Sequence, residues 1–151
     1  MALNSCFYRS ASQHLQKAEE LSREGDLPGA IEEYNQHIQD RLAQEHRPDW
    51  ENPYFYELLI GDLYLRSDDF DLALKSYERA ESQGIDKSLV ADRYRLVAAR
   101  YEQLEEYEAA LTILTKYRDR DPLLFDLVSD RVARAIVQKE ESERSGELSP
   151  P

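Results

Sequence analysis

Cysteine is nearly absent from this sequence: its 151 residues include one, Cys6. A single cysteine cannot form a disulfide within the chain, so packing alone must hold the fold together, and a domain of this length buries enough surface for that. The low cysteine content also fits a protein of a reducing compartment. We therefore expect a cytoplasmic protein.

Long apolar runs are absent as well. No stretch approaches the roughly 18 apolar residues that would span a bilayer, and the start, MALNSCFYRS, has neither a basic segment nor an apolar one of the kind found in secretory signals. We predict no membrane insertion. One alternative stays open, because Leu3–Cys6 is similar to the end of a bacterial lipoprotein signal and would matter if an upstream signal had been removed.

Basic residues are in the minority, with 19 Lys and Arg against 31 Asp and Glu and a formal net charge of −12. Such a chain repels phosphate, and no cluster of Lys and Arg with interleaved aromatic residues reverses the field locally. Nucleic acid is therefore excluded as a partner. Neutral or basic protein segments are the expected partners.

Residue patterns typical of catalysis are missing too. The three histidines, His14, His37 and His46, have no cysteine or carboxylate at a recognised metal-ligand spacing, and Cys6 is far in sequence from all of them. No glycine-rich phosphate loop and no G-x-S-x-G motif occurs. The sequence predicts no enzyme, no metal site and no cofactor.

Glycine and proline are scarce, 5 and 6 residues, and they divide the chain into segments with apolar residues three and four positions apart. These segments are rich in good helix formers, and no alternating strand pattern competes. The predicted fold class is all-α. The seven expected helices lie near residues 9–24, 27–45, 52–67, 70–83, 88–104, 107–119 and 123–142.

Three segments align on one another, beginning at Gly25, Asp68 and Glu105. Each carries an alanine followed four residues later by a large residue, so both lie on one helix face. A small residue also stands twelve positions before each alanine. The small residues at equivalent positions of the three segments are called the small columns. On the upstream helices they are Ala18, Gly61 and Ala98, and on the downstream helices Ala30, Ala73 and Ala110. The large residues that follow the downstream column are Tyr34, Tyr77 and Leu114.

This pattern of small and large columns resembles the tetratricopeptide repeat, whose period is about 34 residues. The resemblance implies a right-handed solenoid of three antiparallel helix pairs, with repeats at about 11–45, 54–86 and 91–122. A capping helix at 123–142 follows, with a flexible N-terminus at 1–9 and a disordered tail at 143–151. The alanines stand 43 and then 37 residues apart. We expect the first excess to lengthen the second helix and its loop around 43–52, and the second to fall near 83–87.

In such repeats the first helix of each pair lines a concave face. The resemblance therefore implies a protein-interaction scaffold, an adaptor or assembly factor, that holds a partner peptide or helix there. The alternative is a self-associating subunit, a homodimer formed through the terminal helices. The predicted groove residues are Phe55, Leu58, Asp62, Leu65, Arg66, Arg95 and Glu102.

Some of these residues have a second interpretation. Phe55, Leu58 and Leu65 are either the apolar floor of the groove or core between helix pairs. Trp50 either clamps its loop onto the third helix or is an exposed anchor for a partner. The carboxylate clamp that one branch of the family uses for chaperone tails is absent, because Leu15 and Glu19 occupy the matching positions.

Overall fold

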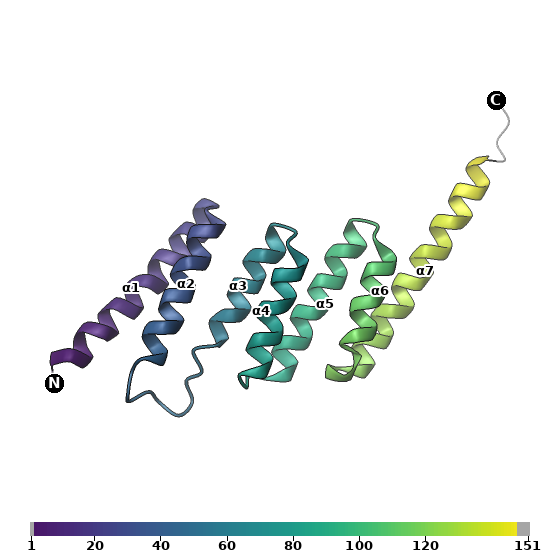
Figure 1. Cartoon of the computed structure of the whole chain (residues 1–151). Helices are drawn as coiled ribbons and strands as arrows, with labels where there is room; N and C mark the ends of the chain where they lie inside the picture. Colours follow the sequence, from purple (N-terminus) through teal and green to yellow (C-terminus); the bar gives the residue numbers. More distant parts are fainter. Residues whose placement is uncertain (1, 148–151) are drawn as a thin grey trace. The chain divides into compact units, whose positions relative to one another are not determined.

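The computed structural model describes the backbone of residues 2–147 and the side chains of residues 12–146. Every regular element in this part of the chain is a helix, and the two helices of each pair run antiparallel (Figure 1). The elements are α1 (Ala2–Glu24), α2 (Leu27–Leu42), α3 (Phe55–Arg66), α4 (Phe70–Ser82), α5 (Lys87–Gln103), α6 (Tyr107–Lys116), the 3₁₀ helix η1 (Arg118–Arg120) and α7 (Pro122–Glu147). The predicted all-α fold of three antiparallel helix pairs and a seventh helix is confirmed.

The chain forms two compact units, Met1–Asp86 and Lys87–Pro151. The first unit contains the pairs α1/α2 and α3/α4, and α2 packs on α3 within it. The second contains the pair α5/α6, with α7 packed on α6.

The first helix of each pair ends in the same turn. Gly25, Asp68 and Glu105 have φ angles of 88°, 59° and 59°, which lie in the left-handed region. The next amide then donates a 2.9 Å hydrogen bond to a carbonyl five residues earlier; these bonds join Asp26 to Leu21, Asp69 to Tyr64 and Glu106 to Tyr101. This is the Schellman type of helix end. The three turns therefore share one geometry, although only the first uses glycine.

The predicted small columns are the sites of close helix contact. Their members, Ala18, Ala30, Gly61, Ala73, Ala98 and Ala110, are all buried. At Gly61 the fit is tightest, because an added Cβ would lie 2.3 Å from Cε1 of Tyr77. The Tyr77 hydroxyl donates a 2.8 Å hydrogen bond to Asp62, which fixes the ring over the glycine. The pair α3/α4 thus depends on a residue without a side chain.

The second unit has its own core. Tyr94 of α5 and Tyr117 after α6 stack with ring centroids 3.6 Å apart and planes 7° from parallel. Phe125, Val128 and Val132 give α7 one buried face. Leu123, Leu127 and Val137 of the same helix are exposed, so its apolar residues do not all lie on the face that packs.

Several boundaries differ from the sequence-based expectation. α1 begins at Ala2, where a flexible segment was expected over 1–9, because neither glycine nor proline interrupts the chain before Gly25. α7 continues to Glu147, so residues 143–147 of the expected tail are helical; residues 148–151 lie outside the described part. α6 ends at Lys116 instead of 119, since η1 follows.

The inserted residues between the first two repeats form a loop only. α2 ends at Leu42, so the expectation of a helix lengthened to residue 45 is wrong. The last turn tightens at this point, because the amide of Gln44 donates to the carbonyl of Arg41, only three residues earlier, at 3.3 Å. The connection from residue 43 to 54 is what distinguishes this first unit from a regular repeat pair.

Candidate functional site

The loop between α2 and α3 is held at both ends. Arg41 is buried on α2, and its Nε donates a 2.6 Å hydrogen bond to Oε1 of Glu51. The Nη2 atom of the same side chain donates to Oε2 of Glu51. This bidentate geometry fixes orientation as well as distance. Farther along, Asn52 donates a 2.8 Å hydrogen bond to the carbonyl of Gln83, which follows α4. The loop therefore has a defined course over the ends of two helix pairs.

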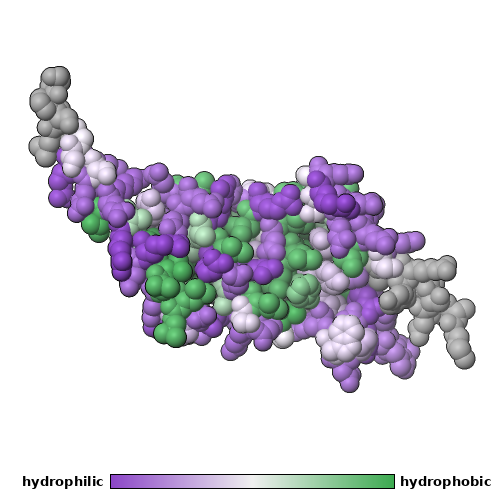
Figure 2. All heavy atoms as spheres, turned by 180° about the vertical axis from the view of Figure 1, so that it is seen from behind, coloured by the Kyte–Doolittle hydropathy of each residue, from purple (hydrophilic) through white to green (hydrophobic). Residues whose placement is uncertain are grey.

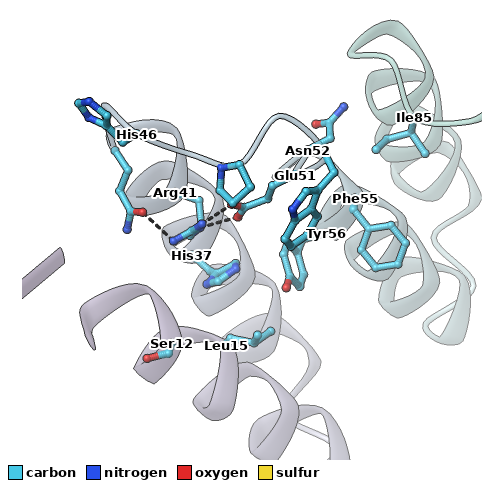
Figure 3. Close-up of a pocket in the computed structure, with 13 residues that line it drawn as sticks. Ser12, Leu15, His37, Arg41, His46, Glu51, Asn52, Phe55, Tyr56 and Ile85 are labelled. Atoms are coloured by element: carbon cyan, nitrogen blue, oxygen red, sulfur yellow. Dashed lines mark hydrogen bonds and ion pairs between the residues drawn. The ribbon is translucent and has the colours of Figure 1, made fainter. Parts of the chain in front are cut away.

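Beneath this loop lies a depression of about 750 Å³ within the first unit (Figure 3). Its walls come from α1, α2, the loop, α3 and Ile85, which follows α4. The lining residues are Ser12, Leu15, His37, Arg41, Gln44, His46, Pro48, Trp50, Glu51, Asn52, Phe55, Tyr56 and Ile85. The insertion in the sequence is thus the element that closes the depression on one side.

Aromatic rings form much of its interior. The His37 ring meets Tyr56 edge-on at 4.4 Å between centroids, and Phe55 meets Tyr56 edge-on at 5.8 Å. Such edge-to-face contacts hold rings in a fixed arrangement. Burial raises the pKa of the Tyr56 hydroxyl, and the nearby Glu51 carboxylate adds to the rise. Tyr56 therefore stays neutral and acts as a hydrogen-bonding apolar wall.

Two aromatic side chains at this site remain open to solvent. Trp50 is 84% exposed and Phe55 is 43% exposed. For Trp50 the exposed interpretation is the one the structure bears out, and its expected packing onto the third helix is wrong. The loop is fixed by Arg41 and Asn52 instead, which leaves the indole ring free to contact another molecule.

The predicted groove residues on α3 have different environments. Phe55 lines the depression, whereas Leu58 has no exposed surface and belongs to the core. Leu58 as a groove residue is therefore wrong, and its alternative assignment to the core holds. Leu65 is half-buried. Because α3 is apolar on nearly every side, its sequence does not distinguish the face toward its neighbours from the face toward solvent.

The charged members of the predicted set already have partners. Asp62 accepts the Tyr77 hydroxyl, and Arg66 donates to Oγ of Ser22 at 3.0 Å. In the second unit Arg95 pairs with Asp92 at 2.6 Å, and Glu102 pairs with Arg131 at 2.5 Å. A partner would have to replace these contacts to use the same groups.

Comparison with known proteins bears on the fold. No family model and no curated protein matches the sequence, whereas 15 solved chains match the structure. One is the TPR2B domain of yeast Sti1, from its complex with pHsp70, with 15% identity and a TM-score of 0.52, covering 84% of this chain and 98% of that one. This chain has the tetratricopeptide repeat fold. The resemblance noted in the sequence is confirmed at that level.

Within this tetratricopeptide repeat fold, most of the residues that line the depression were not predicted from the sequence. His37, Arg41, Asn52 and Ile85 are distant from one another in sequence and meet only in the folded unit. Two signals did point to the region, the excess of residues between the first two repeats and the aromatic group at Trp50, Phe55 and Tyr56. Leu15, which stands at a position of the absent carboxylate clamp, also lines the depression.

Over the residues with described side chains, no group of three or more histidine, cysteine or acidic residues is placed to hold a metal ion. In the same part of the chain, no helix has the length and apolar character needed to cross a membrane.

Proposed function

We propose that this chain is a protein-binding module that holds a peptide or helix of a partner in the depression of its first unit, as an adaptor or in complex assembly. The observation that carries the proposal is a depression of about 750 Å³ under a loop fixed by Arg41 and Asn52, with Trp50 and Phe55 exposed at it. A surface of this kind, formed before binding, avoids the entropy loss of ordering a loop.

The chemistry of the depression suggests an apolar anchor on the partner. Trp is enriched among the residues that dominate binding energy, and exposed aromatic rings gain most from being covered. The carboxylate of Glu51 is already satisfied by Arg41. Since the chain carries a net charge of −12, neutral or basic residues flanking that anchor would be attracted to the surface.

The partner of the yeast Sti1 domain is not carried over to this chain. At 15% identity the likeness concerns the fold, and the positions at which related repeats hold a terminal carboxylate carry Leu15 and Glu19 here. Leu15 is an apolar wall of the depression. A partner segment longer than the depression would continue along α3, past the remaining predicted groove residues of this unit, Asp62, Leu65 and Arg66.

The test is selection of peptides from a random displayed library on the purified full chain, followed by affinity measurements by calorimetry. We expect selected peptides to carry an apolar or aromatic anchor. Trp50→Ala and Phe55→Ala should each weaken binding by about tenfold or more, the effect of losing an interface hot spot. Trp50→Ala should leave the thermal unfolding midpoint nearly unchanged, because that side chain is 84% exposed, whereas Phe55→Ala should lower it slightly, because Phe55 also contacts Tyr56.

Leu89→Ala is the matched control, since Leu89 is an apolar residue of the second unit that is about as exposed as Phe55. Its affinity for the selected peptides should equal that of the wild type. Failure to select any peptide, or equal affinity for all three variants, would contradict the proposal.

A further inference from the structure

The outer face of α7 carries a regular pattern that its packing does not use. Phe125, Val128 and Val132 turn inward. The opposite face presents Leu123 and Leu127, 86% and 70% exposed, and Val137, 51% exposed. Figure 2 shows hydrophobic side chains gathered over the first turns of this helix. Single exposed apolar residues are ordinary on protein surfaces, but here two leucines and a valine share one helix face.

Two charged residues complete this face. Asp130 and Arg134 lie between the apolar positions, so the spacing along Leu123, Leu127, Asp130, Arg134 and Val137 is four, three, four and three residues. That alternation is the spacing of the a and d positions of a two-helix coiled coil, here with a charged pair between apolar residues. These five residues form the α7 seam. Both charged side chains are exposed, and neither forms a hydrogen bond or ion pair with any residue that the structure describes.

The order of residues along the α7 seam is self-complementary in one direction only. In an antiparallel pair centred on Val132, Asp130 lies opposite the partner's Arg134, and Leu127 lies opposite the partner's Val137, each contact occurring twice. Leu123 lies opposite the partner's Glu141, so the ends of the seam are its weaker part. A parallel pair would instead place Asp130 against Asp130 and Arg134 against Arg134, which repel.

We propose that the α7 seam binds a second copy of this chain, forming an antiparallel homodimer about Val132. The surface lies in the second unit and is separate from the depression proposed to bind a partner. A single pair of helices buries less than the roughly 1,600 Å² of a standard interface, so the dimer is expected to be weak, with dissociation at about 10–100 µM.

Sedimentation equilibrium of the full chain between about 1 and 500 µM tests this range. We expect the apparent mass to rise from one chain toward two. Asp130→Arg and Arg134→Asp should each remain monomeric, because each places like charges across the seam twice. An equimolar mixture of the two variants should dimerise again, since every seam charge then meets its opposite. Leu127→Ala should also shift the transition at least tenfold upward in concentration.

Glu140→Arg is the control, because it changes the net charge by the same amount as Asp130→Arg from an exposed position of α7 outside the seam. It should dimerise at least as well as the wild type. A wild-type chain that stays monomeric throughout the range, or a dimer that Asp130→Arg leaves intact, would overturn the proposal.

The antiparallel direction is tested by disulfide trapping in a Cys6→Ser background. A mixture of Leu127→Cys and Val137→Cys chains should form the mixed disulfide under mild oxidation, because these residues lie opposite each other only in the antiparallel pair. Efficient linkage of Leu127→Cys chains to one another would show a parallel pair and would refute the arrangement proposed.

Discussion

At the scale of single residues, the lack of a side chain at Gly61 decides how closely α3 packs on α4. The Tyr77 ring occupies the space that a Cβ atom at this position would need. Alanine is the better helix former by about 1 kcal/mol. Here that gain is outweighed, because Tyr77 is fully buried, its hydroxyl is bonded to Asp62, and the ring has no free volume to move into.

We therefore expect Gly61→Ala to lower the free energy of unfolding by about 1–3 kcal/mol, the usual effect of overpacking a core. Urea denaturation measures the change. Gly146→Ala serves as the comparison, because an added Cβ there meets nothing within 4 Å and the same substitution should leave stability unchanged or slightly higher. Equal stability of wild type and Gly61→Ala would show that the ring is not a fixed neighbour.

At the scale of elements, the three turns that close the helix pairs have one backbone and different residues. Gly25 adopts its positive φ freely, whereas Asp68 must adopt a φ of 59° that is unfavourable for a residue with a side chain. Asp69 then begins α4 by accepting a hydrogen bond from the amide of Leu72. The turn geometry is thus maintained by the surrounding helices and not by the residue at its centre.

Asp68→Gly should consequently raise the free energy of unfolding by about 0.5–1 kcal/mol, as relief of the left-handed strain exceeds the added chain entropy of glycine. The reciprocal change, Gly25→Ala, should lower it by about 1 kcal/mol. No atom lies within 4 Å of the added Cβ at Gly25, so that loss would report the backbone alone. Calorimetric unfolding of the two variants compares them, and a loss for Asp68→Gly would contradict the strain argument.

The sequence predicted these elements well wherever a local rule decides. The small residues that recur on the upstream and downstream helices mark places where helices approach closely, and those positions are buried. The assignment of Leu58 was wrong because α3 is apolar on nearly all sides, so periodicity gives it no preferred face. The position of Trp50 was left open because it depends on Arg41 with Glu51 and on Asn52 with the carbonyl of Gln83, and no sequence rule foresees such pairings.

At the scale of the whole molecule, the response to acid combines two opposite contributions. Hydrogen bonds from His14 and then Lys17 lower the pKa of Glu33, so this carboxylate stabilises the fold above its unfolded pKa and ceases to do so as the pH falls through its folded value. The pKa of Glu105 is likewise lowered by its hydrogen bond from Lys139, and that of Asp126 by Arg118.

Glu57 acts in the other direction. Burial raises its pKa above the ordinary 4.5, and the nearby Arg79 offsets this only in part. The folded chain therefore binds this proton more tightly than the unfolded chain does. The resulting stabilisation is complete below pH 4.5 and is lost as the pH rises through the folded value. The repulsion within a chain of net charge −12 has the same sign, because it weakens as carboxylates take up protons.

These contributions together predict a maximum of stability in mildly acidic solution, between pH 4.5 and 7, and a decline below it as Glu33, Glu105 and Asp126 lose their charges. Thermal unfolding across pH 3 to 8 measures the curve. Glu57→Gln should be more stable than the wild type at pH 7, because the substitution removes a charge that burial disfavours. Arg79 is largely exposed and remains hydrated when its partner becomes neutral. That advantage should disappear below pH 4.5, where Glu57 is neutral in both states. A constant difference between the two proteins at every pH would mean that Glu57 acts through packing and not through its charge.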